Sequence, residues 1–175
     1  MKVLPKVIYF SRKYENLIDG KVVELAKGNT EVVAAKISQS IACEQLELQA
    51  VTSYPKSYNK MVEIAENEKR DQLRPLFYGL EKALKREILF LGFSNWCGGL
   101  PKIVVHFLEN YNTKGKTIFP FCTLEGSAFG NSLFELKALC PHAKIMTGLA
   151  VHGSRVYRAD EAVKNRLVQY NKLEE

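Results

Sequence analysis

The sequence has few of the side chains from which metal centres and disulfide frameworks are built. Its four cysteines lie far apart and form no C-x-x-C pair, and its three histidines have no ligand spacing with each other or with the cysteines. These spacings give no support for a zinc or iron–sulfur site. We therefore interpret the cysteines as reduced thiols that are buried as small apolar side chains.

Long apolar runs are also missing. The longest of them, such as residues 88–93, span only a few positions, whereas a helix that crosses a membrane needs roughly 20 apolar residues. Pro5 interrupts the short apolar stretch near the first residue, and no small-residue cleavage site follows it. We therefore predict a cytoplasmic protein with no secretory signal and no membrane span.

No part of the chain concentrates charge of one sign. The 25 basic and 19 acidic residues give a formal net charge of +6, but the basic residues are scattered. Helical stretches such as residues 63–70 mix both signs, which is typical of a solvated face. A protein that binds nucleic acid gathers its basic residues in a stripe or patch. The sequence therefore predicts no nucleic-acid partner.

Strand-like and helix-like segments alternate along the chain. Strands are expected at residues 6–10, 45–51, 87–93, 117–121 and 144–149, and helices at 30–42, 58–70, 101–110, 132–139 and 160–172. This alternation predicts a doubly wound α/β fold with a parallel sheet. The length and the apolar content fit one domain, residues 1–175, with a well-buried core.

The loop after the first strand has the composition of an anion site. Ser11 and Arg12 precede a polar stretch that ends in Gly28-Asn29-Thr30, where a helix is expected to begin. Backbone amides at the start of a helix attract anions, and hydroxyl groups and an arginine add donors. A helix cap after a long loop explains this segment equally well.

The loops after the third and fourth strands are rich in glycine and short polar residues. Trp96 is the one tryptophan of the chain and is followed closely by Gly98 and Gly99, and residues 123–131 repeat the glycine-rich character. A flat indole beside glycines that allow close backbone approach suits a ligand ring. Such loops meet at the carboxyl edge of a parallel sheet. Together the three loops predict a flat, phosphorylated ligand.

Five segments in this order resemble a bacterial flavodoxin-like family. They are Val7-Ile8-Tyr9-Phe10-Ser11-Arg12, Gly28-Asn29-Thr30-Glu31-Val32, Leu91-Gly92-Phe93 with Asn95-Trp96, Pro120-Phe121-Cys122-Thr123 with Glu125-Gly126-Ser127, and Gly148-Leu149-Ala150 with Gly153. The resemblance extends from Lys6 to the region of Val156. In a subgroup of this family an insertion divides the phosphate-binding loop, and residues 13–27 would be that insertion here.

The resemblance implies a flavodoxin-like three-layer sandwich with a five-stranded parallel sheet of order 2-1-3-4-5, and FMN as the prosthetic group. By position, the residues implied at the phosphate are Ser11, Arg12, Asn29 and Thr30, with Asn16 closing the insertion over it. Asn95 would lie near the ribityl chain, and Tyr54-Pro55 would approach from one side. The residues implied around the isoalloxazine ring are Trp96, Cys97, Gly98, Thr123, Leu124, Glu125, Gly126 and Ser127.

Two departures from the family pattern lie beside the implied ring. Cys97 and Leu124 stand where relatives often carry a second tryptophan and a histidine, which bears on the flavin's redox potential more than on its binding. The basic charge balance predicts a midpoint potential less negative than that of acidic flavodoxins. Glu125 would oppose this if it points inward; the alternative is a solvated loop carboxylate.

Two functions are compatible with this family resemblance. One is an electron carrier that passes electrons to a redox partner protein. The alternative is an NAD(P)H-dependent FMN oxidoreductase that reduces a quinone or a similar acceptor. We prefer the carrier because the sequence has no visible nicotinamide-phosphate motif, and no residue is predicted to act as a general acid, base or nucleophile. A regulatory module without flavin fits poorly with three ligand loops.

Overall fold

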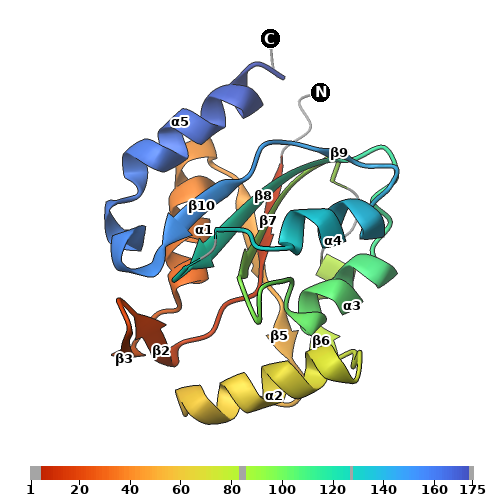
Figure 1. Ribbon diagram of the computed structural model, residues 1–175. Helices are drawn as coiled ribbons and strands as arrows, with labels where there is room; N and C mark the ends of the chain where they lie inside the picture. The colour runs from red at the N-terminus through yellow and green to blue at the C-terminus, as the bar shows by residue number, and fades with distance from the viewer. Residues whose placement is uncertain (1–4, 83–85, 127, 174–175) are drawn as a thin grey trace.

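A parallel β-sheet forms the centre of the computed structural model, which describes residues 5–82, 86–126 and 128–173 (Figure 1). Its strands are β1 (Lys6–Tyr9), β4 (Glu44–Glu47), β7 (Ile88–Ser94), β8 (Thr117–Leu124), β9 (Lys144–Ile145) and β10 (Leu149–His152). They lie in the order β10-β8-β7-β1-β4, with β9 also paired to β8, and every pairing is parallel. The predicted order 2-1-3-4-5 is therefore confirmed.

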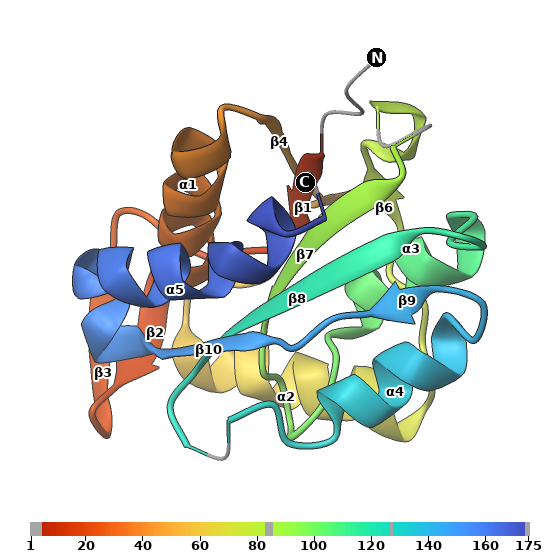
Figure 2. The ribbon, with the colours of Figure 1, turned by 90° about the horizontal axis from the view of Figure 1, so that it is seen from above.

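Helices cover both faces of this sheet and complete the three layers. Figure 2 shows α1 (Asn29–Ile41) and α5 (Asp160–Asn171) on one face, and α3 (Lys102–Asn110) and α4 (Ser132–Leu139) on the other. The fifth helix, α2 (Tyr58–Arg70), lies across the end of the sheet at the bottom of Figure 1. Two short 3₁₀ turns, η1 (Leu80–Lys82) and η2 (Gly153–Arg158), complete the helical elements of the described chain.

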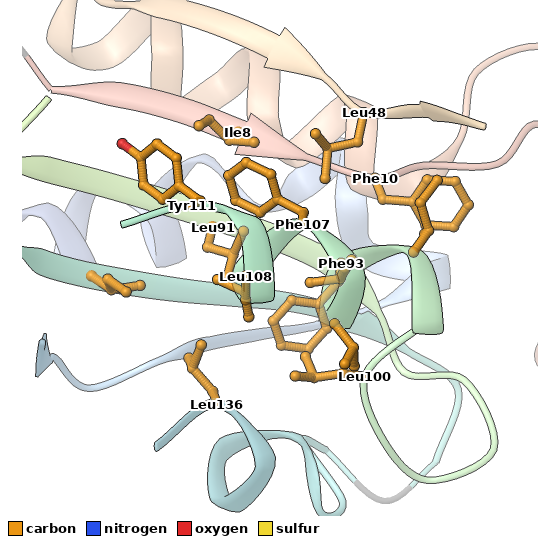
Figure 3. Close-up of a cluster of buried hydrophobic side chains, with 14 of the residues drawn as sticks. Ile8, Phe10, Leu48, Leu91, Phe93, Leu100, Phe107, Leu108, Tyr111 and Leu136 are labelled. Carbon is orange, nitrogen blue, oxygen red and sulfur yellow. The ribbon is translucent and has the colours of Figure 1, made fainter. Parts of the chain in front are cut away.

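Two hydrophobic cores follow from the alternation of side chains along the strands. In β1, Val7 and Tyr9 face α1 and α5, whereas Ile8 faces α3. Figure 3 shows the second of these cores, in which Ile8 lies near Phe107 of α3. Burying a side chain of this size stabilises the fold by about 1.5–3 kcal/mol. The central strands are covered on both sides, as their continuous apolar sequence predicts.

Two predicted strands have different boundaries in the structure. The segment predicted at 45–51 leaves the sheet after Glu47, and β5 (Gln49–Ala50) pairs antiparallel with β6 (Phe77–Tyr78) instead. The segment predicted at 144–149 is divided into β9 and β10, because the chain departs from the ladder at 146–148, where Gly148 passes close to the Phe129 ring. Periodicity did not reveal either break.

Residues 13–27 contain a β-hairpin where the sequence suggested only a polar loop. The strands β2 (Tyr14–Ile18) and β3 (Lys21–Leu25) pair antiparallel. Asp19 and Gly20 form the turn with φ angles of 51° and 74°, and two consecutive positive φ values are the signature of the tight turn favoured in hairpins. The Asp-Gly pair between Leu17-Ile18 and Val22-Val23 is the sequence signal that predicts this hairpin.

Whether a helix can cross a lipid bilayer depends on its length and composition. None of the helices of the described residues combines the length and the apolar character that crossing a bilayer requires.

Candidate functional site

A pocket of about 310 Å³ lies at the carboxyl end of the sheet, within the range typical of small-molecule sites. Its walls come from five segments: the β2–β3 hairpin, the start of α1, α2, and the loops that follow β7 and β8. The lining residues are Asn16, Leu17, Asn29, Tyr58, Met61, Val62, Ala65, Glu66, Ser94, Asn95, Trp96, Cys97, Thr123, Leu124 and Glu125.

Three hydroxyl groups fix the start of α1 beside this pocket. The Thr30 Oγ1 atom lies 2.7 Å from Thr123 Oγ1 and 2.9 Å from Ser94 Oγ, and the latter two atoms are 3.1 Å apart. Thr30 and Thr123 are buried. Because buried hydroxyl groups need partners, this cluster ties α1 to the ends of β7 and β8. Thr30 thus lies behind the pocket wall.

The first turn of α1 begins beside the pocket, and its Asn29 and Thr30 amides have no hydrogen-bond acceptor among the described residues. Its N-cap residue, Gly28, supplies no side-chain cap, while the Glu31 amide donates to Ser11 Oγ at 3.1 Å. A Cβ at Gly28 would overlap Ser11 Oγ and lie 2.8 Å from the Arg12 carbonyl oxygen. The chain therefore brings Ser11 and Gly28 into contact although the hairpin separates them in sequence. Asn29 lines the pocket itself.

Arg12 has other partners than those expected for a phosphate-binding residue. Its guanidinium is buried and donates to the carbonyl oxygens of Pro55 and Lys56, at 2.6 Å each, and to that of Glu15. Burial lowers the pKa of Arg12. The side chain holds the segment before α2 against the loop after β1, and it does not line the pocket.

The β2–β3 hairpin connects the two sides of the pocket entrance. The Asn16 Nδ2 atom donates to the Arg12 and Tyr14 carbonyl oxygens at 3.2 and 3.1 Å, which holds Asn16 in the pocket wall. At the tip, the Asp19 amide donates to Glu125 Oε2 at 2.7 Å. The Glu125 side chain is therefore partly buried and engaged by the hairpin, and it lines the pocket.

Trp96 forms an apolar wall that is supported from behind. Its ring packs edge-on against Phe10 and Tyr54, with centroid distances of 5.2 and 5.0 Å. The Tyr54 hydroxyl donates to the buried Glu68 carboxylate at 3.0 and 3.1 Å. Burial raises the pKa of Glu68, and the Tyr54 hydrogen bond opposes this increase. Tyr54 thus lies close to the site, where it supports the Trp96 ring and does not itself line the pocket.

The segment after Trp96 bends sharply. Cys97 has a φ of 50°, and its carbonyl oxygen accepts from Lys69 Nζ at 2.6 Å. Burial, followed by the negative charge of Glu66, raises the pKa of the Cys97 thiol. The thiol is therefore protonated and uncharged near neutral pH.

Asn95 carries an unpaired polar atom at the pocket. Its Nδ2 donates to the Ala128 carbonyl oxygen at 3.1 Å, which fixes the orientation of the amide. Its Oδ1 is buried and has no hydrogen-bond partner among the described residues. Because a buried acceptor without a donor costs free energy, this atom is ready to accept from a hydroxyl or N–H group of a ligand.

The pocket unites eight of the predicted site residues: Asn16, Asn29, Asn95, Trp96, Cys97, Thr123, Leu124 and Glu125. Thr30 lies behind the pocket wall. Four further predicted residues do not line the pocket: Ser11, Arg12, Gly98 and Gly126. Ser127 lies outside the described residues.

The apolar face of α2 was missing from the prediction. Met61, Val62 and Ala65 line the pocket, together with Glu66. The helical spacing of these residues in the sequence indicates an amphipathic helix, but it does not indicate that the apolar face covers the end of the sheet. The Asp-Gly hairpin signal would have found Leu17, which also lines the pocket.

Solved structures show how widely this fold is shared. A proposed flavoprotein from Bacteroides uniformis has a TM-score of 0.72 at 22% identity, covering 92% of this chain and 97% of its own. A proposed flavoprotein from Bacteroides eggerthii has a TM-score of 0.69 at 23% identity, covering 92% and 98%. A Lactobacillus acidophilus flavoprotein in complex with FMN has a TM-score of 0.60 at 16% identity, covering 90% and 98%. These likenesses establish the shared fold.

Sequence comparison identifies the family. None of the proteins with curated descriptions matches this chain. The sequence model of the family described as Flavodoxin matches residues 22–167, which is most of the chain. The protein therefore belongs to the flavodoxin family.

Proposed function

We propose that this protein binds one FMN non-covalently in the 310 Å³ pocket and acts in the cytoplasm as a flavodoxin-type electron carrier. The observation that carries the proposal is the pairing of two chemistries in one pocket. One end presents the amides of α1 and the polar side chains of Asn16 and Asn29, and the other end is apolar. A phosphate with an attached flat ring system matches both ends.

The start of α1 would hold the phosphate. Helix amides and the helix dipole attract an anion at this position, and neither lysine nor arginine is among the described lining residues. The Thr30 hydroxyl cluster keeps the helix terminus in place. In this proposal Ser11 and Arg12 support the phosphate site from behind, through the Glu31 amide and the 55–57 segment respectively.

Asn95 would contact the ribityl chain. Its unpaired Oδ1 needs a donor, and each ribityl hydroxyl group supplies one. The existing bond from its Nδ2 to Ala128 holds the acceptor in place before the ligand arrives.

The isoalloxazine ring would lie between Trp96 and the apolar side chains of α2. When bound, FMN supplies the capacity to accept and release electrons, while the protein excludes water and sets the electrostatics. Glu66 and Glu125 line the same pocket. Their charges disfavour additional negative charge at the ring and oppose the effect of the basic surface on the potential.

The cover provided by α2 favours a carrier over an NAD(P)H oxidoreductase. Met61, Val62 and Ala65 close one side of the pocket, whose volume is at the low end for small-molecule sites. A nicotinamide needs space over the ring face, whereas a carrier needs only an exposed ring edge at which a redox partner protein docks.

An absorption spectrum of the purified protein with added FMN tests the proposal. Flavin bands that persist with NADPH under anaerobic conditions and bleach with dithionite are expected for the carrier. Rapid bleaching with NADPH alone would assign the oxidoreductase instead. No bound flavin after FMN is added would overturn the proposal entirely.

A further inference from the structure

A second pocket, of about 360 Å³, lies beside the edge strand β10. Its apolar part is formed by Leu124 at the end of β8, Ala150 and Val151 of β10, Ala159 just before α5 and Ala162 in the first turn of α5. Figure 2 shows β10 at the outer edge of the sheet, with α5 along one side of it. This pocket meets the proposed FMN site at Leu124.

Two arginines of η2 line the polar side of this pocket. Arg155 and Arg158 are three residues apart on a 3₁₀ turn, in which residues at this spacing project from the same side. Both side chains are exposed. Among the described residues, neither guanidinium has a carboxylate within ion-pair distance. The pair is therefore free to bind an anion.

The chemistry of the two sides is complementary to a phosphorylated molecule with an apolar portion. A guanidinium presents paired N–H donors that match phosphate oxygens. Inorganic phosphate would use the arginines alone and leave the apolar side empty. A nucleotide would use both, with its phosphate on Arg155 and Arg158 and its base or sugar on the exposed side chains of Ala150 and Ala162.

The second pocket adjoins the first through one shared residue. Leu124 lines both pockets. Beside it, the His152 Nε2 atom donates to the Glu125 carbonyl oxygen at 3.1 Å and closes the wall between them. His152 also lines the second pocket, and the carboxylates of Asp19 and Glu125 lie 3.8 and 3.7 Å from its ring nitrogens. Because these carboxylates repel an anion, we expect an anion to bind at the end of the pocket that carries the arginines.

We propose that the pocket between η2, β10 and α5 binds a nucleotide through Arg155, Arg158 and the apolar surface that Ala150 and Ala162 form beside them. This site goes beyond the proposed function, because its ligand does not contact the FMN pocket except across Leu124. It gives the flavoprotein a separate place at which a phosphorylated nucleotide binds.

Isothermal titration calorimetry with adenosine 2′,5′-bisphosphate tests this site. The titration is made on FMN-saturated protein and repeated without FMN, so that a failure of FMN binding does not obscure the result. Wild-type protein is expected to bind the nucleotide more tightly than inorganic phosphate in both cases. Equal affinity for the nucleotide and for inorganic phosphate would overturn the proposal.

Variants separate the arginines from the apolar surface. The double variant R155A/R158A is expected to lose about tenfold or more in nucleotide affinity, whereas K164Q/K172Q, which removes two positive charges from exposed positions of and beside α5, is expected to retain it. Ala162→Phe fills the apolar part and is expected to weaken nucleotide binding while leaving phosphate binding unchanged. Wild-type nucleotide affinity in R155A/R158A or in Ala162→Phe would contradict the assignment.

Discussion

The two pockets on either side of Leu124 attract an anion by different means. The pocket at the start of α1 has Asn16, Asn29 and the helix terminus at its polar side, and neither lysine nor arginine lines it among the described residues. The pocket at β10 presents two exposed arginines. Both join a polar end to an apolar end, but only the second relies on formal positive charge.

The difference lies in how firmly each polar end is held. Thr30 is fully buried and is linked by hydrogen bonds to two neighbouring strand ends, so the amides of α1 are oriented before a ligand arrives. Arg155 and Arg158 are exposed and must lose side-chain freedom on binding. The comparison teaches that fixed dipoles suit a permanent prosthetic group, whereas exposed charges suit a ligand that exchanges.

The largest expected effect follows from a methyl group at Gly28. Gly28→Ala forces the start of α1 away from the Arg12 carbonyl oxygen, which would lie 2.8 Å from the new Cβ. Because overpacking typically costs about 1–3 kcal/mol, FMN affinity is expected to fall about tenfold or more. Fluorescence titration with FMN measures this change. Gly115→Ala, at a residue with φ of 75° and open space around it, is expected to lose stability without losing FMN affinity. Unchanged FMN affinity in Gly28→Ala would contradict the role of the fixed start of α1 in binding FMN.

A carboxylate on the inner face of α2 tests the apolar end of the first pocket. Val62→Asp places an unpaired charge in the pocket, and FMN affinity is expected to fall about tenfold or more, because burying such a charge costs several kcal/mol. Ile64→Asp is the matched control, since Ile64 lies on the same helix and does not line this pocket. Equal FMN affinity in the two variants would contradict the placement of the ring against α2.

Salt dependence distinguishes the two pockets directly. Raising the salt concentration from about 0.05 M to about 0.5 M shortens the screening length to a few ångströms. Binding of adenosine 2′,5′-bisphosphate to the exposed arginines is expected to weaken several-fold, while FMN binding at the partly buried amides changes less. Calorimetric titrations at both salt concentrations measure this. Equal salt sensitivity would remove the distinction between fixed dipoles and exposed charges.

The smallest effect concerns the support behind Trp96. Burial raises the pKa of Glu68 above its ordinary value of 4.5, so the folded state keeps its proton to higher pH than the unfolded state. The Glu68 contribution to stability is therefore lost as pH rises from 4.5 through the folded-state pKa. Glu68→Gln removes this dependence.

Urea unfolding from pH 4 to pH 8 compares Glu68→Gln with wild type. The stability of the variant relative to wild type is expected to increase over the titration range and then to level off. Glu63→Gln, on the exposed side of α2, controls for the loss of a carboxylate from this helix. A stability difference between Glu68→Gln and wild type that does not vary with pH would contradict the role of burial.

The alternation of strands and helices, α2 among them, was predictable because apolar periodicity records which faces of an element are buried. The sheet order came from the family resemblance. The predicted helix at 58–70 matches α2 from Tyr58 to Arg70. The breaks in the second and fifth strands were not predictable, because they depend on contacts such as that between Gly148 and Phe129, which are distant in sequence.

The site was predictable where it follows a strand and unpredictable elsewhere. Asn95, Trp96 and Thr123 follow or end strands, and the parallel sheet brings such positions together. The Arg12 side chain instead meets the 55–57 carbonyl groups, because a long side chain finds its acceptors according to tertiary packing. The position of α2 over the pocket likewise depends on packing that the periodicity of one helix does not record.

The central claim is that the pocket at the carboxyl end of the sheet holds one FMN with its phosphate at α1. Titration of the flavin-free protein with FMN and, separately, with riboflavin tests this most directly, because riboflavin lacks only the phosphate. We expect one FMN per chain and a markedly weaker affinity for riboflavin. Equal affinities would contradict the phosphate site, and no binding of either flavin would contradict the claim as a whole.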